Sequence, residues 1–268
     1  MTLLRGASVL LLSTALSACP RLPPLDYGKD GPAKDGAELL KRIEFADAQI
    51  FSVRGDAKLI VESPQGKGSV SLFIAVLHPA QLHIEQLDFF GRPEGILITD
   101  GERFGLYDAK QRKYFRGPAS VENMARFVPI ALPPRELASL LLGRVPRVPP
   151  ESTELTIDEP SRTYGLSLKR GAITQRLNVS TGTHRVTKSR VEGLNTYAID
   201  ADDLTAYGAA TLPRHLTLDA PSANTKVELL YKDITVNEAP EVTMFEIEPP
   251  EGVPVVEVQA NGQAVPVP

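Results

Sequence analysis

The sequence has few of the residues that build redox and zinc centres. One of its 268 residues is cysteine, none is tryptophan, and 6% are aromatic. A single cysteine cannot form an internal disulfide, a Cys-based zinc cluster or a CxxC redox pair. The formal net charge of −4 argues against a broad basic face that holds nucleic acid. With 42% hydrophobic and 23% charged residues, the composition is that of a globular chain, which excludes a disordered or collagen-like one.

The apolar run at the N-terminus is too short to span a membrane. A short cationic start at residues 1–5 is followed by about ten apolar residues between Ala7 and Leu16, whereas a span needs roughly 20. Small residues then precede the single cysteine, Cys19. A cationic start, a short apolar segment and small residues before a cut site indicate a secretory signal, here residues 1–18.

The tetrapeptide Leu16-Ser17-Ala18-Cys19 resembles the lipobox of bacterial lipoproteins. That resemblance implies that Cys19 is the lipid-attachment site and that the preceding peptide is removed. The alternative is an ordinary signal peptide with a cysteine near its end by chance. Lipidation would explain the unpaired thiol of an exported protein. By resemblance to enterobacterial lipoproteins, the absence of Asp after Cys19 favours the outer membrane, with the anchored protein facing the periplasm.

The mature chain begins with a predicted flexible tether and a helix. Residues 19–36 are rich in proline, glycine and charge, which is typical of a linker between lipid and domain. The next segment has apolar residues at helical spacing, with charged residues between them. The residues that would form the apolar face are Leu39, Leu40, Ile43, Ala46 and Ile50.

Residues 54–116 alternate in polarity with a period of two, which predicts about six short strands joined by hairpin turns. Residues 70–77 are apolar on both faces, so this strand is expected to be covered on both sides. Two short helices follow. Ser120 can cap residues 121–127, and Pro133-Pro134 can start a helix over 135–142.

Alternation resumes after a proline-rich connector at 144–150 and predicts a second set of strands up to Val236. The connector could separate two domains. A single curved antiparallel sheet explains the strands on both sides equally well, and we prefer it. Residues 250–268 are rich in proline, valine and glycine and are expected to trail out of the fold as a C-terminal tail.

Several stretches resemble the LolA/LolB superfamily of bacterial lipoprotein carriers and receptors. They are residues 53–59, the paired strands at 70–89, the segment 100–108 with its Asp-Gly turn, and a C-terminal series comprising 212–218, 227–237 and 245–253. With a lipobox in front, the LolB side is the nearer relative. The resemblance implies a mainly β fold over residues 37–249, an incomplete antiparallel β-barrel of about eleven strands with a lid of short helices.

The resemblance also implies an apolar cavity that binds the acyl chains of lipoproteins or phospholipids. The candidate cavity residues are Leu72, Phe73, Ile74, Val76, Leu137, Leu140 and Leu141. Ordinary core packing is the alternative for each of them. In LolB-type receptors a loop between early strands touches the membrane, and the corresponding turn here contains Phe89 and Phe90. Two adjacent side chains on a strand point to opposite faces, so one of the pair is expected outside.

No motif predicts an enzyme, a metal site or a cofactor. The four histidines, His78, His83, His184 and His215, form no HxxxH or HExxH pattern, and no nucleophile or phosphate-binding motif is present. His83 and Glu85 share a strand face, which we interpret as an exposed face. The expected partners are the membrane, acyl chains and a periplasmic carrier protein, in lipoprotein localisation or insertion. The alternatives are a sensor or tethering module of the same fold and an envelope hydrolase.

Overall fold

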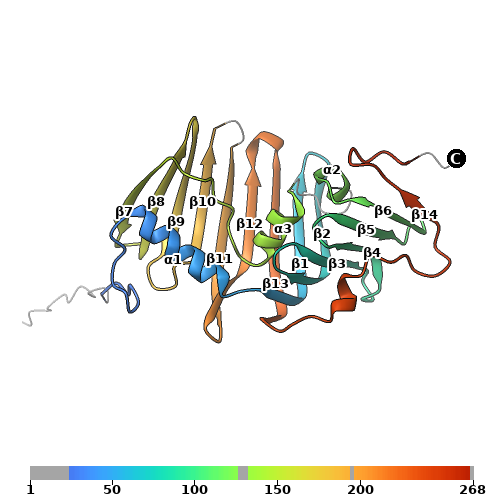
Figure 1. Ribbon diagram of the computed structural model, residues 1–268, viewed down its shortest axis with the longest axis horizontal. Coiled ribbons are helices and arrows are strands. Elements are labelled where there is room, and N and C mark those ends of the chain that lie inside the picture. The colour runs from blue at the N-terminus through green and yellow to red at the C-terminus, as the bar shows by residue number, and fades with distance from the viewer. Residues whose placement is uncertain (1–23, 126–131, 194–195, 266–268) are drawn as a thin grey trace, which may run out of the picture.

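The computed structural model describes residues 24–125, 132–193 and 196–265 of the chain (Figure 1). The predicted signal at 1–18, with its lipobox residues Leu16, Ser17 and Ala18, and the predicted lipid-attachment site Cys19 lie outside the described residues. Within the described part, no helix is both long enough and apolar enough to cross a membrane.

The described strands form one sheet of fourteen in the order β14-β6-β5-β4-β3-β2-β1-β13-β12-β11-β10-β9-β8-β7, with β14 Val255–Glu257 at one edge. The first meander consists of β1 Ser52–Ser63, β2 Gly66–Leu77, β3 Gln81–Leu87, β4 Pro93–Thr99, β5 Arg103–Asp108 and β6 Lys113–Pro118. The second consists of β7 Ser152–Asp158, β8 Thr163–Arg170, β9 Ile173–Ser180, β10 Val186–Glu192, β11 Tyr197–Tyr207, β12 Ala210–Ala220 and β13 Thr225–Val236. The predicted single sheet is therefore confirmed, antiparallel except where β14 pairs with β6, although it has more strands than the eleven expected.

The two meanders join where β1 pairs with β13 along almost their full lengths, from Val53 opposite Val236 to Glu62 opposite Lys226. A bulge near Gly55 interrupts this pairing. Gly55 has a φ of +143°, and a Cβ there would overlap the carbonyl oxygen of Asp233, so the position requires glycine. The long pairing of the first strand with the thirteenth joins the two meanders into one sheet.

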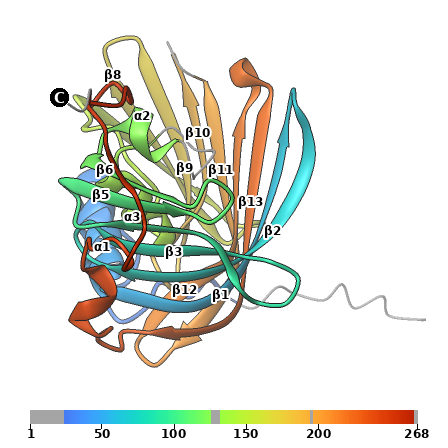
Figure 2. The same cartoon turned by 90° about the vertical axis from the view of Figure 1, so that its right-hand side faces the viewer.

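The sheet is strongly curved. In Figure 2, β3, β5 and β6 run across the direction of β8–β13, so the sheet wraps around a concave face. The alternating apolar residues of the strands point to this face and are buried there, as Leu82 and Ile84 of β3 are, with Leu97 opposite Ile84 on β4. The concave face therefore holds the hydrophobic core, as the period-two pattern predicts.

Three helices have bounds close to the predicted ones. In α1, Gly36–Ala48, the N-cap Asp35 accepts a hydrogen bond from the backbone N–H of Glu38. In α2, Val121–Met124, the predicted cap Ser120 accepts one from Asn123, while residues 126 and 127 of the predicted helix lie outside the described part. Helix α3, Pro134–Leu141, starts at Pro134 as predicted. Figure 1 places α1 and α3 over the same face of the sheet.

The C-terminal segment does not trail out of the fold over its described part, which corrects the prediction for residues 250–265 of the expected tail at 250–268. Two 3-10 turns, η1 Pro221–Ala223 and η2 Val242–Phe245, precede it, and β14 Val255–Glu257 then pairs in parallel with β6. Val258 is buried, and its N–H donates to the carbonyl oxygen of Arg116. The edge of the first meander has unpaired backbone groups that the segment satisfies, and residue composition does not report this long-range pairing.

The predicted flexible tether at 19–36 is likewise held in place over its described part. The Nη2 group of Arg162 donates to the carbonyl oxygen of Pro24 at 3.1 Å, and the ring centroids of Tyr27 and Tyr164 are 5.8 Å apart. The N–H of Ala33 donates to the Tyr164 hydroxyl at 2.9 Å. From Pro24 onward this segment therefore lies against β8 and the adjoining turn.

Candidate functional site: an apolar pocket beneath helix α3

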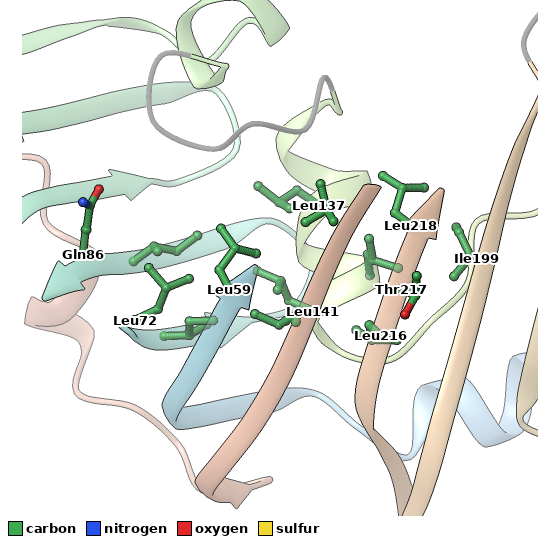
Figure 3. Close-up of a pocket in the computed structure, with 14 residues that line it drawn as sticks. Leu59, Leu72, Gln86, Leu137, Leu141, Ile199, Leu216, Thr217 and Leu218 are labelled. Carbon is green, nitrogen blue, oxygen red and sulfur yellow. The ribbon is translucent and has the colours of Figure 1, made fainter. Parts of the chain in front are cut away.

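An apolar pocket lies between the concave face of the sheet and α3 (Figure 3). Strands from both meanders contribute to it because β1 and β13 bring them together. Of the fourteen residues that line it, only Gln86 and Thr217 have polar side chains. The apolar ones are Leu59, Leu72, Ile74, Ile84, Leu137, Leu140, Leu141, Ile199, Leu216, Leu218, Val227 and Leu229. A nearly continuous aliphatic lining cannot satisfy buried polar groups, so this pocket suits a hydrocarbon.

Five of the seven cavity candidates line this pocket, namely Leu72, Ile74, Leu137, Leu140 and Leu141. The other two lie elsewhere. Phe73 lies on the opposite face of β2, where its ring contacts His83 edge-on and the Arg54 guanidinium lies 5.7 Å from its centroid. Adjacent strand residues point to opposite faces, so Phe73 cannot share the pocket with Leu72 and Ile74. Val76 faces inward and is fully buried in the core beyond the pocket.

The free space in the pocket is small, about 50 Å³. Since one water needs roughly 10–15 Å³ of such space, the pocket as it stands has room for a few waters but not for a long acyl chain. Leu137, Leu140 and Leu141 of α3 line one side of this space. Helix α3 is thus the cover of the pocket.

Polar contacts hold the C-terminal end of α3 down. The hydroxyl of Tyr231 on β13 donates to the carbonyl oxygen of Leu141 at 2.7 Å. Burial raises the pKa of Tyr231, which keeps the hydroxyl a neutral donor. Gly143 follows the helix with a φ of +69°, and its carbonyl oxygen accepts a hydrogen bond from Nη2 of Arg185. Tyr231 and Arg185 therefore fasten the cover to both the sheet and α1.

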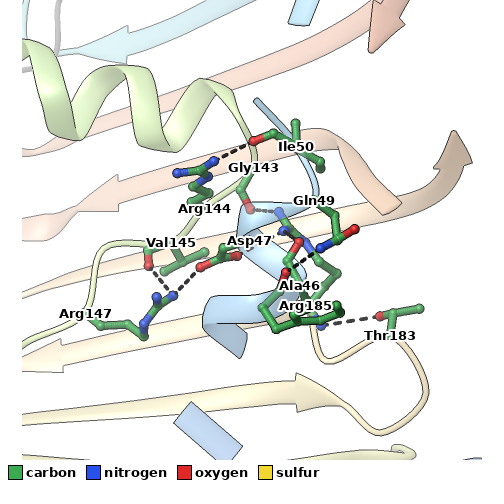
Figure 4. Close-up of polar contacts among 11 residues, drawn as sticks. Ala46, Asp47, Gln49, Ile50, Gly143, Arg144, Val145, Arg147, Thr183 and Arg185 are labelled. Carbon is green, nitrogen blue, oxygen red and sulfur yellow. Dashed lines mark hydrogen bonds and ion pairs between the residues drawn. The ribbon is translucent and has the colours of Figure 1, made fainter. Parts of the chain in front are cut away.

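Arg185 belongs to a cluster of three arginines near the buried carboxylate of Asp47 (Figure 4). Asp47 lies 3.0 Å from Arg185 and 2.7 Å from Arg147, measured from carboxylate oxygen to guanidinium nitrogen. Arg144 donates to the carbonyl oxygen of Ile50 at 2.5 Å. Burial lowers the pKa values of Arg144 and Arg185, and in each case the charge of Asp47 opposes that shift.

The cluster lies where the C-terminal ends of α1 and α3 meet. Arg185 donates to the carbonyl oxygen of Ala46 at 3.2 Å as well as to that of Gly143. Each helix end has a partial negative charge of about half a unit, so the two ends help to balance the excess of guanidinium groups. Sequence reasoning missed this cluster, because Asp47 and Arg185 are 138 positions apart and no local pattern links them.

No protein-family model matches the sequence, and no curated protein is significantly similar to it. Solved structures do match. A DUF1329 family protein from Desulfovibrio piger has a TM-score of 0.55 at 10% identity, covering 79% of this chain and 95% of that one. A domain assigned to outer-membrane lipoprotein sorting, from Vibrio parahaemolyticus, gives 0.52 at 10% identity over 79% and 96%. A LolA superfamily protein from Nitrosomonas europaea gives 0.50 at 13% identity over 78% and 96%.

The chain has a LolA-like fold. The predicted resemblance to the LolA/LolB superfamily is thereby confirmed at the level of the fold, as is the mainly β class. At these identities the similarity extends to the architecture alone.

The turn between β3 and β4 of this LolA-like sheet presents two phenylalanines to solvent. Phe89 is 96% exposed and Phe90 77% exposed, and their ring centroids are 5.4 Å apart. Asp88 shapes the turn, since its carboxylate accepts hydrogen bonds from the backbone N–H groups of Phe90 and Arg92 and from the Arg92 side chain. These hydrogen bonds, above all that from the Arg92 backbone, lower the pKa of Asp88. A turn braced in this way holds both rings outside the fold.

The histidines of the LolA-like domain lie apart from one another. Among the described residues, no group of three or more His, Cys, Asp and Glu side chains could hold a metal ion. His83 does contact Glu85, with 2.7 Å between Nε2 and a carboxylate oxygen, and its Nδ1 lies 2.7 Å from the carbonyl oxygen of Met244. The side chain of His83 is only 12% exposed. The predicted exposed face is therefore wrong at this position, because η2 packs against β3.

Proposed function

We propose that this chain is a lipid-anchored lipoprotein of the bacterial outer membrane that faces the periplasm and binds acyl chains in the pocket beneath α3. Its role would be in the localisation or insertion of lipoproteins, as a binding protein and not as an enzyme. The observation that carries the proposal is the aliphatic lining of a pocket closed by a short helix.

The energetics favour exchange of the α3 leucines for an acyl chain. Exposing Leu137, Leu140 and Leu141 would cost about 1.5–3 kcal/mol each, or about 5–9 kcal/mol together. An acyl chain of about fifteen methylenes gains about 0.8 kcal/mol for each one that leaves water, or about 12 kcal/mol. The bound chain therefore offsets the opening of the cover, whereas the empty pocket closes.

The exposed turn and the N-terminal pattern support a place at the membrane. Phe89 and Phe90 can insert two rings into the interfacial region, and each buried ring contributes about 1.5–3 kcal/mol. Lipidation at Cys19 would supply the permanent anchor. The names of two similar structures, a LolA superfamily protein and an outer-membrane lipoprotein-sorting domain, agree with this assignment.

Native mass spectrometry with lipid extraction tests the pocket, using the mature chain with Cys19→Ser. We expect co-purified lipid or acylated peptide, together with uptake of a fluorescent acyl probe. Leu140→Glu should abolish both, because it places a carboxylate against aliphatic walls. Val242→Glu is the matched control, since it adds the same charge at a side chain that is 79% exposed. A folded wild-type protein that takes up no acyl probe would refute the proposal.

A binding or sensor module of the same fold that never transfers lipid is the second candidate. Transfer requires the pocket to deliver its chain to a bilayer, and the exposed Phe89 and Phe90 favour that role. A donor-to-acceptor assay with an acylated peptide and vesicles separates the two. If the Phe89→Ser/Phe90→Ser variant transfers less lipid than wild type while its probe uptake is unchanged, the result supports a carrier or receptor. Uptake without any transfer would support the sensor module.

A further inference from the structure

A small polar hollow adjoins the apolar pocket and shares Gln86 with it. Its free space is about 160 Å³, and its polar side chains are Gln86, Glu94, Tyr107, Asp108 and Lys110. Figure 3 places Gln86 at one end of the apolar pocket, away from the leucines of α3. A ligand that fills the pocket would therefore meet polar groups at this end.

The hollow continues the concave face of the sheet. Leu72 pairs with Gln86 across β2 and β3, Gln86 pairs with Gly95 on β4, and Gly95 pairs with Asp108 on β5. Paired residues of neighbouring strands share a face. The same row of side chains thus changes from aliphatic to polar at Gln86, which matches an amphiphile with its polar end over β4 and β5.

The charged groups of the hollow differ in how far they are already engaged. The Asp108 carboxylate accepts hydrogen bonds from the backbone N–H groups of Lys110 and Gln111 and from the Gln111 side chain. Glu94 has longer contacts, 3.3 Å to Nε2 of Gln86 and 3.9 Å to Nζ of Lys110. Its side chain is 38% exposed and that of Lys110 is 75% exposed. Glu94 and Lys110 are therefore the groups open to a ligand.

We propose, on the basis of the acyl-binding function above, that this hollow binds the polar end of an amphiphile that has an ammonium group. Two carboxylates and one ammonium make the hollow net negative, which favours a cationic group and disfavours a purely anionic one. Glu94 receives the ligand's ammonium group. Lys110 lies beside it, in position for a phosphate or carbonyl oxygen of the same headgroup.

Two sources offer this chemistry: the ethanolamine headgroup of a phospholipid, and the free α-amine of a diacylated N-terminal cysteine on a lipoprotein. The mature chain with Cys19→Ser is titrated with vesicle-derived phosphatidylethanolamine and phosphatidylglycerol of equal chain length. It is also titrated with a diacylated lipopeptide, with or without an acetyl group on its α-amine. Bound ligand is counted by native mass spectrometry. Preference for either free amine over its amine-less partner supports the proposal, and the preferred pair identifies the source.

The variant Glu94→Gln should reduce that preference about three- to tenfold, because it removes the charge and keeps the shape. Binding of the amine-less ligands should stay the same. Glu192→Gln is the matched control, an exposed glutamate of β10 in an ion pair with Arg176. If wild type binds all four ligands equally, or Glu94→Gln leaves the preference intact, this inference fails and the acyl pocket stands. If wild type binds none of them, the proposed function fails instead.

Discussion

Replacement of Arg185 by methionine tests whether the arginine cluster holds the cover of the pocket in place. Arg185 is 1% exposed and links Asp47 to the ends of two helices through the carbonyl oxygens of Ala46 and Gly143. Methionine has a similar length but no donors. Asp47 is itself 6% exposed and forms ion pairs with Arg185 and Arg147. The variant would leave it paired with Arg147 alone of these two.

The expected loss of stability follows from the burial of the Arg185–Asp47 ion pair. Breaking a buried ion pair by removing one partner costs about 3–5 kcal/mol, and because Arg147 still engages Asp47 we expect the lower value, about 3 kcal/mol. Urea unfolding with a slope of about 3 kcal/mol per molar would then show a midpoint about 1 M lower. The cover also loses its contact at Gly143, so uptake of an acyl probe should become faster than in wild type.

A double-mutant cycle separates the charge pair from simple loss of packing. Asp47→Leu alone should also be strongly destabilising, since it leaves Arg185 buried without a carboxylate. In the double variant Arg185→Met/Asp47→Leu neither of the two positions holds a buried charge, so the two losses should not add and the coupling should be at least about 2 kcal/mol. Losses that add within about 0.5 kcal/mol would refute the role of the pair, and unchanged probe uptake in Arg185→Met would refute its link to the cover.

Three further outcomes are expected. Tyr231→Phe removes the hydrogen bond to Leu141, so stability should fall by about 1 kcal/mol and acyl-probe uptake should quicken; slower uptake would contradict this. Burial lowers the pKa of His184 below its ordinary 6.5, so below that pH the unfolded chain binds a proton that the folded chain does not. Stability should therefore fall as pH drops through 6.5, and less so in His184→Asn, which tolerates the φ of +54°. Phe89→Ser/Phe90→Ser should weaken vesicle binding about 100-fold, by about 3 kcal/mol, with urea unfolding unchanged.

Local patterns were sufficient for most elements of the sheet and for α3. Alternation with a period of two predicts β1–β13 because each strand buries one face. This alternation can be read from the few consecutive residues of each strand. Leucines at helical spacing after Pro134 likewise predict the apolar side of α3. The same reasoning erred where local apolarity did not specify a face. The apolar run at 70–77 predicts Phe73 in the pocket beside Leu72, but adjacent strand residues point to opposite faces.

Features that depend on distant pairing could not be predicted. The short strand β14 has three residues, and it forms because the edge of β6 offers hydrogen-bonding groups more than a hundred positions earlier in the chain. The contacts of Tyr27 and Ala33 with Tyr164 likewise join residues more than a hundred positions apart in the chain. Composition indicated flexible termini for both segments, since proline and glycine report local conformation and not the surface available for docking.

The amino-acid sequence by itself determined the mainly β character, most of the strands and the leucines of the cover, because each is a property of neighbouring residues. Only the tertiary structure decided that β1 pairs with β13, that this pairing gathers leucines from both meanders into one pocket, and that Arg147 and Arg185 converge on Asp47. Those features depend on strand register and on contacts between residues far apart in the chain. Loop closure and side-chain packing decide these, and neither can be read from neighbouring residues.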